Sequence, residues 1–249
     1  MDLGITGRRA AIAAGSAGLG LGVARALSAE GCAVAICGRS PHRFADALAS
    51  LGDGAVAIEA DLSDPDEAER FAAEAATQLG GPLDIVVANA GGPPPGSASA
   101  TDLDGYRDAL ELNCLSTIAL ANATVGPMRV AGWGRIVAIT SIGARQPIPY
   151  LAASTTARAA VTAYIKSLSL EVAADGVTAN TVQPGSHDTD RIRSLGGGAV
   201  EGARAEIPVG HLGDPDDFGA VVAFACSTQA NFITGASIIV DGGASRGLQ

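Results

Sequence analysis

Aromatic side chains and cysteines are scarce in this chain of 249 residues. Phe, Trp and Tyr make up 4 % of the residues, whereas 47 % are hydrophobic, so the core has to be built mainly from Ala, Val, Ile and Leu. The four cysteines, Cys32, Cys37, Cys114 and Cys226, show no zinc-binding spacing. A chain of this length also needs no disulfides to be stable. We therefore predict reduced, buried thiols and no metal site.

Runs of basic residues and long apolar runs are also missing. The net charge is −10 and no cluster of Lys and Arg is present, which argues against binding to nucleic acid or to an anionic membrane surface. No stretch reaches the ~18 uncharged apolar residues of a membrane span. The first ten residues contain no apolar signal segment. These absences predict a cytoplasmic protein that acts on small molecules.

What the chain does have is a regular alternation of short Val/Ile/Ala runs and longer amphipathic segments. The predicted strands are residues 9–14, 33–37, 55–60, 85–88, 135–140, 178–182 and 237–240. The predicted helices lie near 19–30, 41–51, 64–79, 102–130, 150–174 and 214–228. Apolar strands separated by helices indicate a parallel sheet covered on both faces. Without a repeat or a break in composition, residues 1–249 are predicted to form a single α/β domain, a Rossmann-type doubly wound parallel sheet of about seven strands.

Some helix boundaries are marked by local sequence. Asp64-Pro65 and Asp214-Pro215 each place a capping carboxylate and a proline at the start of a predicted helix. By contrast, the segment 194–202, with glycines at 196–198, is expected to be the least regular part of the chain.

The first predicted strand runs into a glycine-rich turn at the start of a helix. Residues 13–20 read Ala-Ala-Gly-Ser-Ala-Gly-Leu-Gly. Glycines let the backbone pass close to a pyrophosphate, and the free N–H groups of a helix start attract phosphate. The turn therefore predicts dinucleotide contacts from Gly15, Ser16, Gly18, Leu19 and Gly20. The alternative is a group of glycines that only caps the helix.

The end of the second predicted strand bears on the type of nucleotide. An acidic residue at this place would bind the adenosine ribose hydroxyls, but the chain has Arg39-Ser40. A guanidinium and a hydroxyl suit a 2′-phosphate. We therefore favour NADP(H) over NAD(H). The alternative is that Arg39 is a solvated surface residue.

Further motifs follow the other predicted strands. They are Asp61-Leu62, Asn89-Ala90-Gly91, Asn113, Pro184-Gly185 with Thr189, and the segments 233–235 and 240–243. In this order, and together with the turn at 13–20, they resemble the classical short-chain dehydrogenase/reductase family over nearly the whole chain. The family's TGxxxGxG turn here has Ala13-Ala14 in place of Thr-Gly. The resemblance implies that Asp61 and Leu62 contact adenine, that Asn89-Ala90-Gly91 binds the cofactor, and that Pro184-Gly185 with Thr189 holds the nicotinamide. Asn113 matches the asparagine of the family's catalytic tetrad, and the segments 233–235 and 240–243 match its C-terminal signature. It also implies that the two long predicted helices pair in a homodimer or homotetramer.

The family's catalytic tetrad is altered in this chain. In the family an asparagine, a serine, a tyrosine about thirteen residues later, and a lysine four residues after that act together. The matching positions here are Asn113, Ser141, Ser154 and Arg158. An aliphatic hydroxyl is a far weaker acid than a phenol, so Ser154 does not replace the tyrosine. Arg158 keeps the charge and the ribose contacts but does not transfer protons. The chain thus resembles 3-oxoacyl-carrier-protein-reductase-like members with an atypical tetrad.

Three groups are candidates for the missing proton donor. Tyr150 precedes Ser154 by four residues and would share its helix face if the helix already runs there; otherwise it packs at the helix start. His187 lies where the family has an apolar residue over the nicotinamide, and histidine titrates near neutral pH; the alternative is a loop histidine in solvent. The third candidate is a water held by Ser141, Ser154 and Asn113.

The sequence therefore supports three hypotheses. The first is an NADP(H)-dependent oxidoreductase of a carbonyl or hydroxyl substrate. The second is a non-catalytic NADP(H)-binding sensor or assembly protein, motivated by the altered tetrad. The third is a dehydratase or isomerase on the same scaffold.

Overall fold

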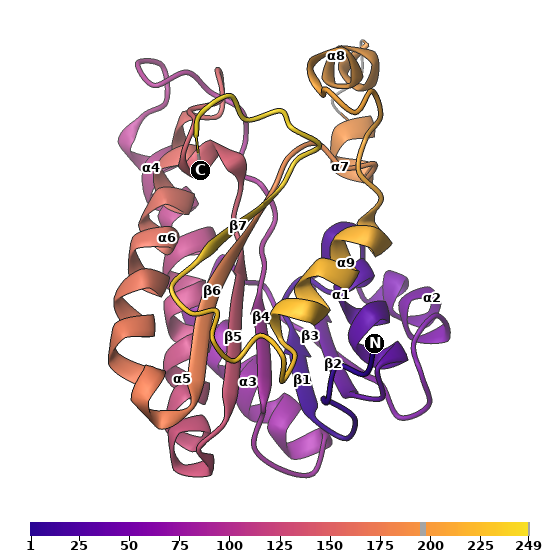
Figure 1. Ribbon diagram of the computed structural model, residues 1–249. Helices are drawn as coiled ribbons and strands as arrows, with labels where there is room; N and C mark the ends of the chain where they lie inside the picture. The colour runs from indigo at the N-terminus through magenta and orange to yellow at the C-terminus, as the bar shows by residue number, and fades with distance from the viewer. Residues whose placement is uncertain (195–197, 249) are drawn as a thin grey trace.

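A single parallel sheet organises the chain. In the computed structural model, which describes residues 1–194 and 198–248, seven strands lie in the order β3-β2-β1-β4-β5-β6-β7 (Figure 1). They are β1 (Arg9–Ile12), β2 (Ala33–Gly38), β3 (Val56–Glu59), β4 (Ile85–Ala88), β5 (Gly134–Ile139), β6 (Val177–Pro184) and β7 (Ser237–Val240). The strand order reverses between β1 and β4, and ligands bind beyond the carboxyl ends of strands at such a point. This confirms the predicted doubly wound α/β fold.

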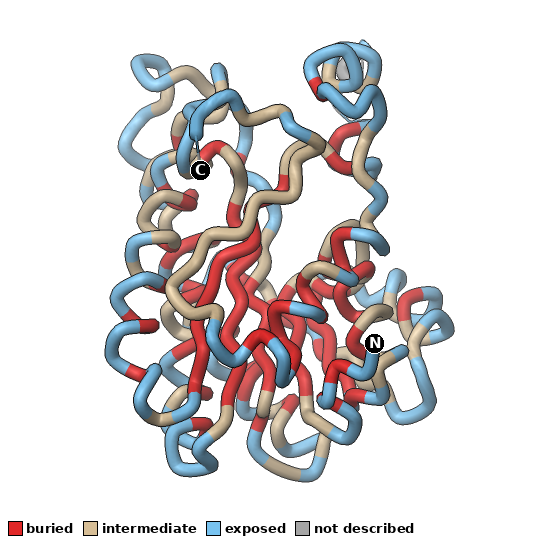
Figure 2. The backbone as a smooth tube through the Cα atoms, viewed as in Figure 1, coloured by how far each residue is buried: buried red, intermediate tan, exposed pale blue. Residues whose placement is uncertain are grey.

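Helices cover both faces of the sheet. They are α1 (Gly18–Ala29), α2 (Phe44–Ala49), α3 (Pro65–Gln78), α4 (Leu103–Leu110), α5 (Ser116–Ala131), α6 (Ala152–Val172), α7 (Asp190–Arg193), α8 (Ala199–Glu206) and α9 (Pro215–Ala225). Successive side chains of a strand point to opposite faces, so Ala10 and Ile12 pack with α1 and α9, whereas Ala11 packs with α3, α5 and α6. Figure 2 shows the central strands of the sheet as the buried centre, whereas the edge strand β7 is intermediate. No helix among the described residues is long and apolar enough to cross a membrane.

Helices α1 and α9 approach each other closely enough for backbones to touch. A Cβ on Gly22 would collide with the carbonyl of Pro215, and one on Gly219 would collide with the carbonyl of Gly22. Glycine is therefore required at both positions for packing. The contact joins the helix that follows the first strand to a helix near the end of the chain.

The chain start is tied to the same late segment. The backbone N–H of Thr228 donates to Leu3 O at 2.9 Å, and its hydroxyl donates to Gly4 O at 2.9 Å. The amide of Gln229 donates to Asp2 O. Residues 2–4 are thus fixed by residues 228–229.

At the amino end of β5, two guanidinium groups enclose an indole ring. The Arg8 and Arg135 guanidinium carbons lie 3.8 and 4.3 Å from the centroid of Trp133. Arg135 is 2 % exposed, and it donates to the carbonyls of Ser227, Gly134 and Gly176. Trp133 is therefore a packing residue.

The predicted helix starts are confirmed, but one long helix is not continuous. Asp64 accepts from Asp66 N at 3.0 Å and Asp214 from Asp216 N at 2.7 Å, so both cap their helices. The single helix predicted near 102–130 is wrong in one respect: a π turn, Glu111–Leu115, separates α4 from α5. Apolar spacing follows the average turn of a helix and does not reveal one inserted residue.

The segment expected to be least regular contains helical structure. The helices α7 and α8 flank it, and α8 overlaps its second half. Residues 195–197, with two of the three glycines, lie outside the described residues.

Candidate nucleotide and catalytic site

The predicted site residues gather at the carboxyl ends of the strands. The glycine-rich turn follows β1, Arg39 follows β2, Asp61 follows β3 and Asn89 follows β4. Ser141 and Pro184-Gly185 stand at the ends of β5 and β6. The parallel sheet therefore brings to one edge motifs that are far apart in the sequence.

The turn from β1 into α1 uses an unusual backbone conformation at two residues. Ala14 has φ +46° and Gly18 has φ +53°. An L-residue other than glycine is strained there by on the order of 1–2 kcal/mol, and Ala14 stands where the related family has glycine. Gly20 leaves room for Asn89, whose Nδ2 would lie 2.9 Å from a Cβ at that position.

The amino end of α1 is free to receive an anion. Its first turn contains no acidic residue, and Ala17 provides no side-chain cap. Gly18 lies against Thr189, since a Cβ there would stand 3.4 Å from the Thr189 Cγ2. Uncapped N–H groups, the helix dipole and a glycine turn together fit a pyrophosphate. These features, on residues of this chain, fit the dinucleotide that the sequence predicts.

Ser16 and Arg39 both lie beside Gly38, at the carboxyl end of β2. A Cβ on Gly38 would be 2.6 Å from the Ser16 hydroxyl, so this hydroxyl rests on the end of β2. The next residue, Arg39, is exposed and makes no hydrogen bond or ion pair with any other described residue. It lines a cavity of about 520 Å³, and Ser40 follows it. An unpaired guanidinium beside a hydroxyl suits a phosphate.

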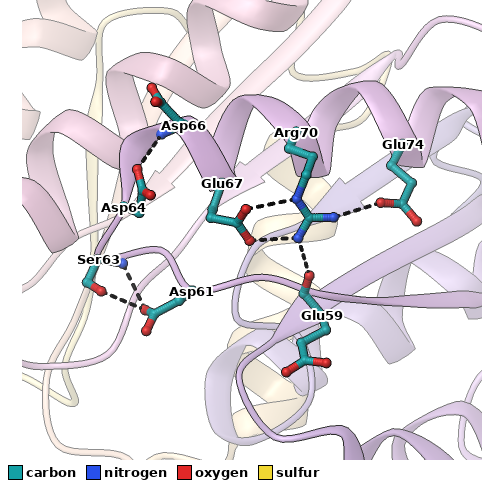
Figure 3. Close-up of polar contacts among 8 residues, drawn as sticks. All are labelled: Glu59, Asp61, Ser63, Asp64, Asp66, Glu67, Arg70 and Glu74. Atoms are coloured by element: carbon teal, nitrogen blue, oxygen red, sulfur yellow. Dashed lines mark hydrogen bonds and ion pairs between the residues drawn. The ribbon is translucent and has the colours of Figure 1, made fainter.

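The second cation in this cavity is already neutralised. Arg70 on α3 donates to Glu67 at 2.6 and 2.9 Å and to Glu74 at 2.9 Å (Figure 3). Its Nη2 also donates to the carbonyl of Glu59 on the edge strand β3. The hydrogen bonds from Arg70 lower the pKa of Glu67. Arg39 is therefore the cation of this cavity that is available to a ligand.

Asp61 lines the same cavity and is held as an anion. Burial opposes its ionisation, but hydrogen bonds from Ser63 N and Oγ and the charge of Arg39 lower its pKa (Figure 3). Leu62 beside it is 6 % exposed. A carboxylate next to an apolar side chain can receive the amino group and the flat face of a base.

At the other end of the site, β6 leads into the segment that contains Thr189. Gly185 N donates to Val240 O at 2.9 Å, and a Cβ on Gly185 would lie 2.7 Å from the Asp241 Cβ. Pro184 and Gly185 are thus fixed against the end of β7. Gly91 is different, because a Cβ there would meet no atom within 4 Å, so open space lies above the turn after β4.

Ser141 is oriented as a hydrogen-bond donor. It caps a short 3₁₀ turn, and its Oγ accepts from Gly143 N at 2.9 Å. Its hydroxyl hydrogen is therefore free for another acceptor. A Cβ on Gly143 would lie 3.2 Å from this Oγ and 3.3 Å from the Thr155 Oγ1, so both hydroxyls border one small space. Ser154, half-buried on the first turn of α6, has no hydrogen-bond partner among the described residues.

Asn113 enters the site from the π turn between α4 and α5. Its Nδ2 donates to Ala109 O at 3.4 Å, whereas its buried Oδ1 has no partner among the described residues. π turns in helices occur frequently at functional sites, since they turn one side chain away from the regular face. The orphaned oxygen is an acceptor for a ligand or a water.

Arg158 is a buried cation at the end of β5. Its Nη1 donates to Ile139 O at 2.7 Å and its Nη2 to Ala90 O at 3.2 Å. Burial and the nearby charge of Arg191 lower its pKa to about 10. The guanidinium therefore stays charged at neutral pH, as predicted, and joins α6 to the strand ends.

Two candidate proton donors lie differently from what the sequence suggested. Helix α6 begins at Ala152, so Tyr150 precedes the helix; it has φ +62° and is 72 % exposed. It does not share a helical face with Ser154. His187 is 6 % exposed and packs on Phe218 with ring centroids 5.1 Å apart, so the alternative of a solvated histidine is wrong.

The geometry of His187 also fixes its protonation. Nδ1 lies 3.1 Å from Gly185 O, and because a carbonyl only accepts, Nδ1 carries the hydrogen. Burial lowers the pKa of the ring below its usual value of 6.5, which keeps Nε2 without a proton at neutral pH.

Sequence reasoning missed two residues of this region. Thr155 has a buried hydroxyl without a partner among the described residues, and its position beside Ser154 was the only signal. Arg191 donates to Pro93 O at 3.0 Å above the turn after β4. Only its neighbour Thr189 carried an assigned role in the sequence.

Comparisons with known proteins agree with this geometry. The sequence model of the enoyl-(acyl carrier protein) reductase family matches residues 13–245. The 3-oxoacyl-[acyl-carrier-protein] reductase FabG of Vibrio cholerae is 31 % identical over 241 residues, which cover 97 % of this chain and 98 % of that protein. The reductase MabA of Mycobacterium tuberculosis is 30 % identical and covers 96 % of this chain and 94 % of its own length.

A solved structure shows the same fold with ligands. L-sorbose reductase from Gluconobacter frateurii, complexed with NADPH and L-sorbose, superposes with a TM-score of 0.93 at 28 % identity over all of both chains. The match to the family model, the relatives that align over almost the full chain, and the superposed structure agree. The chain belongs to the short-chain dehydrogenase/reductase family of oxidoreductases.

Proposed function

We propose that this protein is an NADP(H)-dependent reductase of a carbonyl substrate, similar to the 3-oxoacyl reductases, that works without the family's tyrosine. The observation that carries the proposal is Ser141. Its Oγ is held by Gly143 N, which leaves the hydroxyl hydrogen for the carbonyl oxygen of a substrate. When bound, the nicotinamide supplies the hydride for the carbonyl carbon.

The residues of this chain divide the other tasks. The turn of Gly15, Ser16, Gly18, Leu19 and Gly20 would hold the pyrophosphate, and Arg39 with Ser40 would hold the 2′-phosphate. Asp61 and Leu62 would contact the adenine. Asn89, Ala90, Gly91, Arg158, Pro184, Gly185 and Thr189 would surround the nicotinamide ribose and ring.

The proton source in this proposal is a water, with neither Tyr150 nor His187 as the donor. Tyr150 is exposed, and the one ring proton of His187 is committed to Gly185 O. Asn113 Oδ1 and Thr155 Oγ1 are buried atoms without hydrogen-bond partners in the described part of the chain. A water bound to them beside Ser141 and Ser154 would reach the substrate oxygen. Arg158 would stabilise negative charge on that oxygen.

Assembly and location extend the proposal. Val130 and Leu170, at the ends of α5 and α6, are 92 % and 75 % exposed, which is in keeping with a homodimer or homotetramer formed through these helices. A cytoplasmic location stays a prediction from the sequence.

The experiment compares Ser141→Ala with Ser154→Ala. Turnover is followed as NADPH oxidation with a series of 3-oxoacyl esters. Ser141→Ala should lower kcat by about a hundredfold to a thousandfold, as expected for a lost donor to the reacting oxygen. Ser154→Ala should change kcat far less, because the Ser154 hydroxyl makes no hydrogen bond with another described residue. Equal, negligible effects would contradict the assignment of Ser141. NADPH binding without any hydride exchange would favour a non-catalytic binding protein.

A further inference from the structure

Two arginines donate to the two ends of the same short turn. The turn after β4, residues 90–93, begins with the carbonyl that accepts from Arg158 Nη2 at 3.2 Å and ends with the carbonyl that accepts from Arg191 Nη2 at 3.0 Å. Arg158 comes from α6 and Arg191 from α7, so two separate elements direct a guanidinium group to this place. The space above the turn is open at Gly91.

Neither of these charges is neutralised by the protein. Among the described residues, no carboxylate lies within ion-pair distance of Arg158 or Arg191. The chain has 26 acidic against 16 basic residues, and seven other arginines are paired with carboxylates. A shortage of acids is therefore not the reason. The side chain of Arg158 is also buried, which makes an uncompensated charge costly.

The Arg191 guanidinium lies against the turn by its face. A Cβ on Gly92 would stand 3.1, 3.3 and 3.4 Å from its Nη2, Cζ and Nε, and these nearly equal distances place the plane over the glycine. Glycine is needed at position 92 for this approach. Nη1 and Nε make no hydrogen bond with any described residue, and Nη2 has a second hydrogen besides the one given to Pro93 O. That hydrogen, together with the N–H of Nη1 or Nε, leaves one edge of the fork for a planar acceptor.

We propose that Arg191, assisted by the field of Arg158, binds a carboxylate group of the substrate, so that the protein acts on oxo acids in preference to neutral carbonyl compounds. The inference rests on the proposed reductase function. The cofactor pyrophosphate belongs at the amino end of α1, against Thr189 and Gly18. Arg191 instead reaches the turn 90–93. In the proposed function this turn borders the nicotinamide, where the carbonyl substrate lies, so we assign the anion that Arg191 meets to the substrate.

The first test measures the preference for an oxo acid over its neutral ester. Acetoacetate and its methyl ester are compared as substrates for the whole protein and for Arg191→Gln. In the unmodified protein kcat/KM should favour the acid. Arg191→Gln should lower kcat/KM for the acid by about tenfold to a hundredfold, the effect of a hydrogen bond to a charged group, and leave the ester almost unchanged. Arg191→Lys should restore part of the preference.

A matched control stands two residues away. Arg193 lies on the same helix and is paired with Asp188 at 2.8 Å, so Arg193→Gln should leave the ratio of acid to ester unchanged. The NADPH dissociation constant should be the same for both variants. A weaker affinity for NADPH in Arg191→Gln, with an unchanged ratio, would assign Arg191 to the cofactor and overturn the proposal.

A second measurement separates this inference from the proposed function. Ligand-observed NMR of the NADP⁺ complex compares butanoate with the uncharged butanamide, neither of which is reduced. Butanoate should bind more tightly, and Arg191→Gln should abolish the difference. This result without any turnover would refute the reductase and keep the anion site. Reduction of neutral esters with equal or no binding of the two probes would refute the anion site and keep the reductase.

Discussion

Two buried arginines stand at opposite ends of strand β5 and have different surroundings. Arg135, at the amino end, is covered by Trp133 and donates to three carbonyls. Arg158, whose Nη1 reaches the carbonyl of Ile139 at the other end, donates to two carbonyls and faces a second cation, Arg191. Burial lowers the pKa of both guanidinium groups.

The different surroundings indicate that Arg135 has a structural role and that Arg158 is available to bind a ligand. Carbonyl oxygens and an aromatic face stabilise Arg135 within the protein. Arg158 is left beside open space, a like charge and the turn 90–93. Burial alone therefore does not identify a functional arginine; the partners that surround it do.

The largest expected effect is a difference in catalytic activity between variants of the two arginines. Arg158→Met should lower kcat/KM for carbonyl reduction by about a hundredfold to a thousandfold, because the charge that stabilises the developing oxyanion is lost. Arg135→Met should leave kcat/KM nearly unchanged, since Arg135 lies at the amino end of β5 and the site lies at the carboxyl ends of the strands. Steady-state NADPH oxidation measures both. Similar losses of kcat/KM in the two variants would contradict the distinction between a structural and a ligand-binding arginine.

A third arginine extends the comparison to a charge outside the core. Arg39 is exposed and unpaired among the described residues, so Arg39→Ala should weaken NADPH binding by about tenfold to a hundredfold. NADH binding should hardly change, because NADH lacks the 2′-phosphate. Calorimetric titration with each nucleotide measures this, and Arg43→Ala, which loses an ion pair to Asp190, is the matched control. Equal weakening of both nucleotides would remove the argument for NADP(H).

For the free energy of unfolding we expect the opposite order: the substitution of Arg135 should have the larger effect. Arg135→Met removes the donors of three carbonyls and should lower the free energy of unfolding by about 2 kcal/mol. Arg158→Met also relieves an uncompensated buried charge, so it should cost less than about 1 kcal/mol or raise the stability. Urea unfolding at neutral pH compares them. An equal loss of unfolding free energy in both variants would mean that Arg158 also stabilises the fold.

The smallest effect concerns a buried group that the protein does satisfy. Burial lowers the pKa of His187 from 6.5, so the unfolded chain takes up a proton at this residue before the folded chain does. Its contribution to stability is complete above pH 6.5 and is lost as the pH falls below that value. Unfolding of His187→Leu should therefore depend less on pH between about 7.5 and 5.5 than unfolding of the unmodified protein. If His187→Leu lowered kcat by about a hundredfold, His187 would be the proton donor after all.

The sequence predicted the fold and the edge on which the site lies, because each strand end carries its own local motif. Ser141 follows β5, and Ser154 and Arg158 lie on α6, with a 3₁₀ turn and a loop between the strand and the helix. Their match to the catalytic tetrad stays a prediction. Tertiary packing decided the rest. The burial of His187 depends on Phe218, and the conformation of Tyr150 on where α6 begins. Arg191 acquired a role only once the fold had placed it over the turn 90–93.

The contact between Gly22 and Gly219 has a consequence for synthesis on the ribosome. The helix α1 carries the phosphate-binding turn, but the backbone on which it packs belongs to α9. Residues 2–4 likewise wait for residues 228–229. A chain that is still being translated therefore exposes the nucleotide turn without its support until α9 has left the exit tunnel. In the proposed function, nucleotide binding can begin to protect the newly made protein only after residues 215–229 have been translated.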